Sequence, residues 1–247
     1  MDEATRWLIR QELTGSPHEG LKKAFDVSWR PSACTFDVLK VVPDDRPADS
    51  IVADIADYDA IAPALDGMDA VVHMAADSST QATWESVRDG NIIGTYNIFE
   101  AARRAGVRKI VFASTNHVMG MYDRDQQWPI YASQPVRPDS LYGVSKAFGE
   151  ALGRHYSDQY GLSVICLRIG WFLPEPHNEI AHWMWLSPRD GAQVTWRAIE
   201  SDLTFGIFYA ISANSARHWD ITDTMEKLGY RPEDDAQRFL AEHAPTR

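Results

Sequence analysis

Four almost continuously apolar runs, separated by stretches of helical periodicity, constrain the fold of this chain more than any other feature. These runs, which are typical of strands buried on both faces, are residues 69–76, 108–115, 162–170 and 205–212. The stretches with apolar residues at three- and four-residue spacing, which predict amphipathic helices, are 91–106, 141–161 and 189–202. Strands that alternate with helices pair in parallel through right-handed crossovers. The sequence therefore predicts an α/β fold built on a doubly wound parallel sheet.

The first 47 residues are less regular than the rest. Residues 36–42, "FDVLKVV", indicate a strand that is followed at once by Asp44 and Asp45. The preceding "HEGLKKAF" is compatible with a short helix. The whole chain of 247 residues is long enough for one sizeable core, or for one core with a small appended lobe.

Composition and charge exclude several classes of function. The formal net charge of −11 argues against a nucleic-acid partner and against anionic membrane surfaces, both of which need a basic face. An acidic surface adapted to high salt is an alternative reading of the same charge. No apolar run approaches the roughly 20 residues of a membrane span, and the N-terminus lacks the pattern of a secretory signal. Cys34 and Cys166 are not spaced as metal ligands are, so we expect no metal site. We also expect Cys166 to be a buried free thiol and the protein to be cytoplasmic.

Small and polar residues follow two of the predicted strands. Ala75, Ala76 and Ser78 come after the run 69–76, where small side chains let a flat ligand approach the backbone; an ordinary polar turn is the alternative. After the run 108–115 come Thr115, Asn116 and His117, side chains that can orient a carbonyl or hydroxyl of a substrate. A hydrogen-bonded loop is the alternative there. In doubly wound sheets the ligand lies beyond the carboxyl ends of the strands, which favours binding at both places.

Tyr142 and Lys146 are one turn apart at the start of the predicted helix 141–161, so they lie on the same face. An ammonium beside a phenol favours the phenolate, and we expect Lys146 to lower the pKa of Tyr142 from its usual value of about 10. Such a tyrosine can remove a hydroxyl proton near neutral pH. The pattern YxxxK also occurs in many ordinary helices. Its position after a strand that ends in Ser-Thr favours catalysis here.

The chain resembles the extended short-chain dehydrogenase/reductase family, the NAD-dependent epimerases and dehydratases, in five pieces that follow the family's order. The pieces are "ADI" (53–55), "VVHMAA" (71–76), "NIIGTYNIFEAARRAGVRKIVFAST" (91–115), "LYGVSK" (141–146) and "LRIG" (167–170). Four further pieces are most similar to the uronate dehydrogenase and sugar dehydrogenase branch: "ASTNHVMG", "RIGWFLPEP", "WLSPRD" and "LGYRPEDDA". The resemblance implies one Rossmann-type NAD(P)-binding domain over residues 1–247, with a small C-terminal substrate lobe mainly from residues 171–204 and 214–247.

The resemblance also implies roles for individual residues. Thr115, Tyr142 and Lys146 would be catalytic: the active-site hydroxyl, the acid/base, and the group that holds the nicotinamide ribose. The implied cofactor-binding residues are Gly15, Gly20, Asp44, Asp54, Ile55, Ala75, Ala76, Asn91, Tyr142, Lys146 and Ile169. The implied substrate-binding residues are Ser78, Asn116, His117 and Trp171. Asp44 favours NAD by accepting the ribose hydroxyls, whereas the neighbouring Arg46 suits the 2′-phosphate of NADP.

Two departures from the family pattern bear on cofactor and substrate. In the glycine turn, residues 13–25, His18 stands where a glycine is expected, and a β-carbon there crowds the pyrophosphate, which predicts weak NAD binding. After "RIG", Trp171 replaces a small hydroxyl residue, and Ile180 takes the place of an arginine that meets a sugar carboxylate. His177, His182 and Arg189 are the nearby cations that can replace that arginine.

The resulting leading hypothesis is the NAD-dependent oxidation of a free sugar, an aldose or a uronate, at its anomeric hydroxyl to a lactone. A nucleotide-sugar epimerase or dehydratase is the first alternative, although only about 100 residues follow Lys146, which leaves little for a nucleotide-binding lobe. A relative that kept the fold but lost the cofactor is the second. A homodimer formed through the helices 91–106 and 141–161 is what the family suggests.

Overall fold

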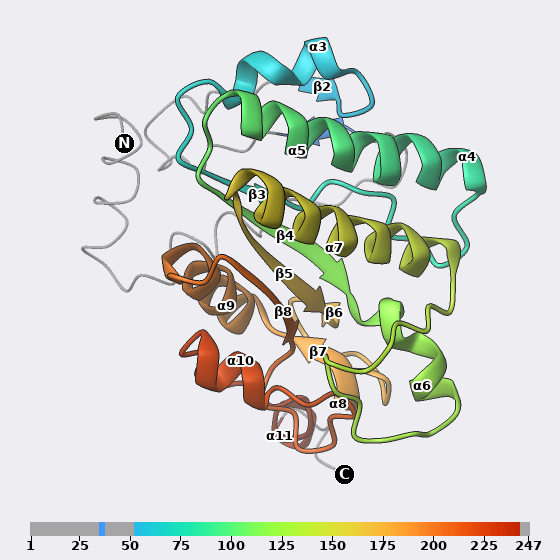
Figure 1. The fold of residues 1–247 in the computed structure, drawn as a ribbon. Helices are drawn as coiled ribbons and strands as arrows, with labels where there is room; N and C mark the ends of the chain where they lie inside the picture. Colours follow the sequence, from blue (N-terminus) through green and yellow to red (C-terminus); the bar gives the residue numbers. More distant parts are fainter. Residues whose placement is uncertain (1–34, 38–51, 243–247) are drawn as a thin grey trace.

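The computed structural model describes residues 35–37 and 52–242, and Figure 1 shows their arrangement. The glycine turn with Gly15 and Gly20, together with Asp44, lies outside the described residues. The strands are β1 (Thr35–Asp37), β2 (Val52–Asp54), β3 (Ala70–His73), β4 (Lys109–Thr115), β5 (Ser163–Ile169), β6 (Trp171–Phe172), β7 (Trp185–Leu186) and β8 (Phe205–Ala210). The helices are α3 (Tyr58–Ile61), η1 (Ala62–Leu65), α4 (Trp84–Ser86), η2 (Val87–Ile93), α5 (Gly94–Arg104), η3 (Asn116–Met119), α6 (Gly120–Arg124), α7 (Leu141–Tyr160), α8 (Ala181–Met184), α9 (Pro188–Glu200), α10 (Thr222–Lys227) and α11 (Ala236–Glu242).

The four predicted strands are confirmed as one parallel sheet in the order β3-β4-β5-β8. The two central strands are buried along almost their whole length, as their continuous apolar character predicts. β1 and β2 form a separate antiparallel pair, so the described end of the predicted strand 36–42 does not join the parallel sheet. The rest of that predicted strand lies outside the described residues.

The three predicted helices are also confirmed, with one extension. The first residues of the helix predicted over 91–106 belong to the π-helical segment η2, which runs into α5. Beyond the C-cap of α5 at Ala105, Gly106 has a φ of 76°, as is common after a helix end. α7 begins after Ser140, whose hydroxyl accepts the Gly143 N–H, and ends at Gly161. α9 begins with Ser187 as N-cap and Pro188 in its first turn.

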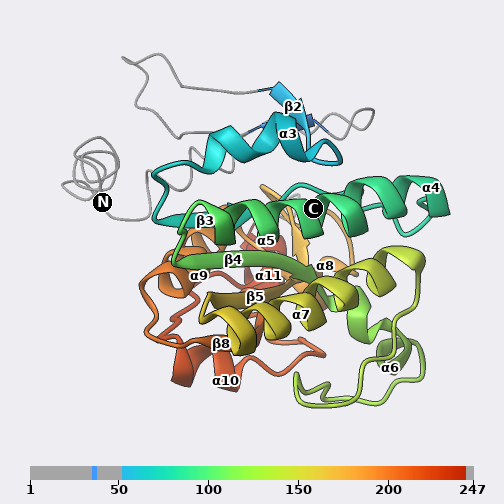
Figure 2. The same ribbon diagram turned by 45° about the horizontal axis from the view of Figure 1, so that its top comes forward.

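Helices cover both faces of the sheet, because successive strand residues point to opposite sides. Phe112 of β4 packs beneath α5 and α7 against Phe99, which in turn packs against Tyr156. Its neighbour Val111 packs on the other face with Val194 of α9. Figure 2 shows α5 and α7 running along the sheet, with α3 beside α5. On this second face of the sheet, residues 188–200 form α9, which packs against β4.

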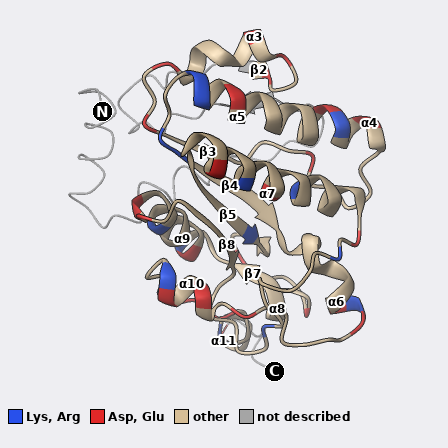
Figure 3. Cartoon of the chain, viewed as in Figure 1, with Lys and Arg blue, Asp and Glu red and all other residues tan. Residues whose placement is uncertain are grey.

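Charged side chains of both signs are mixed over the outer helices (Figure 3). Lys and Arg alternate with Asp and Glu on α5, α9 and α10 rather than gathering into a basic face. Within the described residues, no helix is long and apolar enough to span a membrane.

His73, at the carboxyl end of β3, is a fully buried imidazole. Its Nε2 lies 3.2 Å from the Thr95 hydroxyl oxygen, and its Nδ1 has no partner among the described residues. Burial, with a smaller repulsion from Lys146, lowers the pKa of His73 from 6.5 to about 3. The folded protein therefore carries a neutral His73 in its core.

We expect this histidine to make the fold sensitive to acid. Between pH 6.5 and pH 3 the unfolded chain binds a proton at His73 that the folded protein does not, so stability falls as the pH falls through that window. The contribution amounts to roughly 2 kcal/mol between pH 7.5 and pH 5. Urea unfolding of the wild type and of His73→Gln at both pH values measures it. Equal losses of stability in the two proteins would contradict the prediction.

Candidate active site

Thr115, Tyr142 and Lys146 come together where β4 ends and α7 begins. Thr115 is the last residue of β4, and its side chain lies close enough to the Tyr142 phenol to lower the pKa of that phenol. The Lys146 ammonium lies 5.9 Å from the centre of the Tyr142 ring and 4.8 Å from that of Phe112. All three catalytic candidates are buried. The structure thus places Tyr142 and Lys146 on one helix face, as their spacing predicts.

The ionisation of this pair differs from the expectation drawn from the sequence. Burial raises the pKa of Tyr142 to about 12, although the hydrogen bond with Thr115 opposes this shift, and nearby Asp77 adds to it. Burial lowers the pKa of Lys146 to about 7. The predicted lowering of the Tyr142 pKa by Lys146 is therefore wrong for the protein alone. The physical reason is that desolvation weakens the charged forms of both groups at once.

The first turn of α7 fits tightly against the segment that follows β4. A Cβ atom at Gly143 would lie 2.5 Å from the carbonyl oxygen of His117, so only glycine allows this approach. The backbone N–H of His117 in turn donates to the Thr115 hydroxyl at 3.2 Å. These contacts fix the position of Tyr142 relative to the end of β4.

Asn91 links the turn after β3 to α7. Its side-chain oxygen accepts the N–H of Asp77 at 2.8 Å, and its amide donates to the Asp77 carbonyl and to the Ser145 hydroxyl, each at 2.9 Å. Ser145 then donates to the carbonyl oxygen of Tyr142 at 2.8 Å. Asn91 therefore acts on the site by holding the turn and the catalytic helix together. The π-helical segment η2 carries this buried side chain.

The other described candidates for cofactor binding lie at or just after the ends of β2, β3 and β5. Ala75 and Ala76 are partly buried in the turn that Asn91 holds. Ile55 is fully buried and packs so closely on Gly94 that a Cβ atom there would lie 2.5 Å from Ile55 Cδ1. Asp54 is exposed and accepts the N–H of Ala56 at 2.9 Å. Ile169 pairs with Thr115 and Ala210 at the end of β5.

These residues fit a dinucleotide. Among the described residues the Lys146 ammonium has no hydrogen-bond partner, although Lys146 is only 2 % exposed. A buried ammonium in this state is costly, and the hydroxyls of a ribose supply the missing acceptors. The small side chains at Ala75 and Ala76 leave the adjoining backbone accessible.

The substrate candidates are less closely grouped. Asn116 is buried, with its amide 3.7 Å from the sulfur of Met184. His117 lies beside Tyr142, with ring centroids 6.0 Å apart. Ser78 is exposed. Trp171, in β6, is partly buried in a small cluster with residues of α8 and α11.

Of the cations near the carboxylate position, Arg189 is already engaged. Its guanidinium binds the carboxylates of Asp234 and Glu233, the latter at 2.9 Å. Ile180, the residue that stands in the arginine position, is 45 % exposed at the start of α8. The structure therefore shows no arginine turned from the described part of this segment toward a sugar carboxylate.

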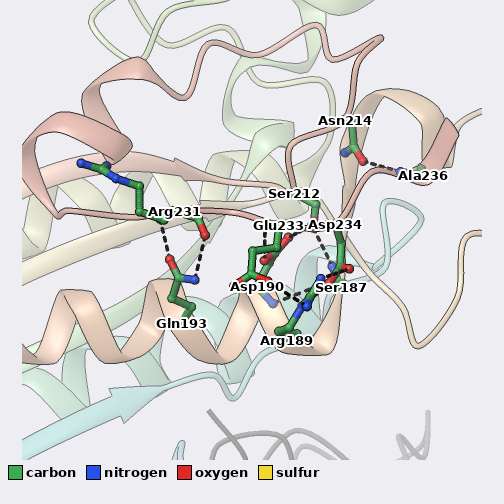
Figure 4. A network of polar contacts seen from close by, with 10 residues as sticks. All are labelled: Ser187, Arg189, Asp190, Gln193, Ser212, Asn214, Arg231, Glu233, Asp234 and Ala236. Atoms are coloured by element: carbon green, nitrogen blue, oxygen red, sulfur yellow. Dashed lines mark hydrogen bonds and ion pairs between the residues drawn. The ribbon is translucent and has the colours of Figure 1, made fainter. Parts of the chain in front are cut away.

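The engagement of Arg189 is part of a larger polar network, which Figure 4 shows. Fully buried Asp190 accepts the backbone N–H groups of Glu233 and Asp234, at 2.9 and 3.0 Å. Gln193 similarly pairs with the backbone of Arg231 through its amide oxygen and nitrogen. The motifs "SPRD" and "LGYRPEDDA" are thus the two sides of one contact that ties the C-terminal segment to the start of α9.

Sequence reasoning missed three residues that shape the site. Asp139 holds His117, and Glu150 forms a buried ion pair with Arg168 at 2.8 Å between α7 and β5. A signal was available for the ion pair, because Glu150 and Arg168 are charges within otherwise apolar patterns. Asp139 gave no such signal, since an aspartate before a helix start is common.

No group of three or more His, Cys, Asp or Glu side chains suited to a metal ion occurs in the described part of the chain. Cys166 is a buried free thiol, and burial raises its pKa well above the usual value. An inert structural cysteine was the expectation from the sequence.

Fold and site define a Rossmann-type protein with a tyrosine–lysine pair at the carboxyl end of its sheet. Residues 27–184 match the NAD-dependent epimerase/dehydratase family, and the chain belongs to that family. L-arabinose 1-dehydrogenase (NAD(P)(+)) from Haloferax volcanii is 44 % identical over 211 residues, which cover 76 % of this chain and 83 % of that one. Uronate dehydrogenase from Pseudomonas syringae pv. tomato is 39 % identical over 191 residues, covering 77 % and 68 %.

Solved structures agree with these relatives. A tyrosine-to-alanine mutant of uronate dehydrogenase from Agrobacterium tumefaciens, complexed with NAD, superposes with a TM-score of 0.72 at 34 % identity. The superposition covers 84 % of this chain and 79 % of that one. The predicted family and the Rossmann-type fold are therefore confirmed.

Proposed function

We propose that this protein oxidises a free sugar at its anomeric hydroxyl, giving a lactone, with NAD as the hydride acceptor. The observation that carries the proposal is the buried Thr115–Tyr142–Lys146 group at the carboxyl end of the sheet, in a chain whose relatives include sugar dehydrogenases. NADP is the alternative cofactor, as the relative from Haloferax volcanii is named for both.

In this reaction Tyr142 removes the proton of the anomeric hydroxyl. Thr115, whose side chain lies near the phenol, orients the substrate oxygen together with Tyr142. Lys146 binds the ribose of the cofactor, which supplies the acceptor for the hydride, and its charge favours the phenolate. Asn91 keeps the turn with Ala75 and Ala76 at a fixed distance from Tyr142. Asp54 and Ile55 flank the adenine, and Ile169 lines the nicotinamide side.

The sugar lies between Ser78, Asn116 and His117, with Trp171 at the rim. We expect neutral aldoses to be oxidised with higher kcat/KM than glucuronate or galacturonate. A carboxylate buried in this pocket needs a cation, while Ile180 is apolar and Arg189 is bound to Glu233 and Asp234. Parallel assays with NAD, following NADH absorbance, compare the two classes. A clear preference for uronates would refute the expectation and would make His177 or His182 the cation to replace next.

Simple measurements distinguish the proposed sugar oxidation from two alternative functions. A nucleotide-sugar epimerase or dehydratase turns over a nucleotide sugar without net NADH formation. A relative without cofactor shows no thermal shift with NAD or NADP. Net NADH formation from a free sugar excludes both.

We propose a homodimer through α5 and α7, which is supported by the exposed apolar side chains on that side of the molecule. These are Ile93, Tyr96, Leu141 and Val144, each between 39 and 47 % exposed. Covering such residues is the usual source of stability in a helical interface. The buried free thiol of Cys166 suits a reducing cytoplasm.

A further inference from the structure

Asp139 and His117 form a partly buried acid–imidazole pair next to Tyr142. The Asp139 carboxylate oxygens lie 3.0 and 3.1 Å from Nδ1 of His117. Burial opposes ionisation of Asp139, but the hydrogen bonds from His117 and Ser140 outweigh it and leave the pKa of Asp139 below its usual value. An ionised carboxylate only accepts hydrogen bonds, so Nδ1 of His117 carries the proton and Nε2 is left as the basic nitrogen.

The pair is held in place by the residues around it. Ser140 donates to Asp139 Oδ1 at 3.0 Å, and the Asp139 backbone N–H donates to the His117 carbonyl at 3.3 Å. Gly120 faces the carboxylate so closely that a Cβ atom there would collide with it. The Asp139 side chain is only 7 % exposed, whereas that of His117 is 31 % exposed. His117 thus connects a fixed buried carboxylate with water.

Tyr142 needs such a connection. The phenol that takes the substrate proton is 9 % exposed, and in each turnover it must pass that proton on before it can act again. His117 meets the Tyr142 ring edge-on, with 6.0 Å between the ring centroids. The charged groups around this pair are Asp139 itself, Arg124 at 3.9 Å from Asp139, and Asp77 near the phenol.

We propose that His117 is the proton outlet of the active site and that Asp139 is its positioning residue. This inference rests on the proposed function. When the sugar is oxidised, its C1–H bond breaks with transfer of hydride to NAD, and its O–H bond breaks with transfer of the proton to Tyr142, as the C=O bond forms. A water shared by the phenol and Nε2 carries that proton to His117. The imidazolium, stabilised by Asp139, releases it to solvent, so one proton leaves for each NADH formed.

The first test uses the protein without substrate or cofactor. Nitrogen NMR of the histidine ring distinguishes Nδ1–H from Nε2–H. We expect His117 to be protonated at Nδ1 in the wild type and to shift toward the Nε2–H form in Asp139→Asn, whose side chain keeps an acceptor for Ser140. The matched control is Asp123→Asn, because Asp123 binds His218 Nδ1 at 2.6 Å in a second pair away from Tyr142. An Nε2–H form of His117 in the wild type would overturn the proposal.

The second test is chemical rescue. His117→Ala should lower the rate of sugar oxidation by about 10²-fold, and added imidazole should restore part of it in proportion to its concentration. His155→Ala, on the exposed side of α7, should keep the wild-type rate and gain nothing from imidazole. Wild-type activity in His117→Ala, or a loss that imidazole does not repair, would show that the proton leaves by another route.

The failures of the two proposals are distinguishable. If the wild type forms NADH from sugars but His117→Ala is unimpaired, the role of His117 as proton outlet is contradicted, while the proposed function is supported. If the wild type forms no NADH from any sugar, the proposed function is contradicted. The proposed role of His117 is then contradicted as well, whatever its tautomer.

Discussion

Tyr142→Phe is expected to reduce kcat by on the order of 10² to 10⁴, the usual effect of losing a positioned general base. The ring and its packing remain, and Thr115 keeps its hydrogen bonds with Asn116 and His117, so the fold should survive. Because burial raises the pKa of Tyr142 to about 12, the phenolate fraction grows with pH across the working range. Wild-type kcat/KM should therefore rise with pH, and this rise should disappear in the variant.

Steady-state assays over a range of pH, with thermal unfolding and NAD titration as checks on the fold, measure the effect. Tyr131→Phe is the matched control, since Tyr131 is 47 % exposed and makes no contact with the site residues described above. Near wild-type turnover by Tyr142→Phe would remove Tyr142 from the role of acid/base.

Arg168→Met is expected to lower the free energy of unfolding by about 3–5 kcal/mol, the range for breaking a buried ion pair. The guanidinium of Arg168, 1 % exposed, binds Glu150 through two nitrogens, each at 2.8 Å, and also donates to the Ala132 carbonyl. Without it, the Glu150 carboxylate is left in the core with the Ser114 hydroxyl as its one hydrogen-bond partner among the described residues. The substitution also loosens α7, which carries both Tyr142 and Lys146.

Urea unfolding measures the loss, and a second substitution tests its cause. Glu150→Leu combined with Arg168→Met should be more stable than Arg168→Met alone, because no unpaired charge then remains buried. The control is Arg154→Met, which breaks an exposed pair with Asp158 on the same helix and should cost at most about 1 kcal/mol. Equal losses for Arg168 and Arg154 would show that burial does not determine the strength of the pair.

Local sequence patterns were sufficient for the sheet and its main helices. The runs that became β3, β4, β5 and β8 are almost continuously apolar, which is typical of a parallel sheet covered by helices on both faces. The spacing of Tyr142 and Lys146 placed them on one face, because helix geometry is local. Gly106 and Gly161 marked helix ends, and both have positive φ in the structure.

The sequence was less informative wherever a property depends on burial or on distant partners. It predicted a lowered pKa for Tyr142 from the proximity of Lys146, but desolvation of both groups dominates. It offered Arg189 as a cation for the substrate, whereas that side chain is engaged by Asp234, 45 positions along the chain.

The sequence by itself therefore determined the class of fold, the family and the tyrosine–lysine pair, because periodicity and short motifs are properties of neighbouring residues. Only the tertiary structure decided which charges are buried and with what they pair. Asp139 approaches His117 from a loop 22 positions away, and Arg168 reaches Glu150 from an adjoining strand. Contacts of this kind depend on how helices and strands pack, and the free energy of a charge depends on the solvent that this packing removes.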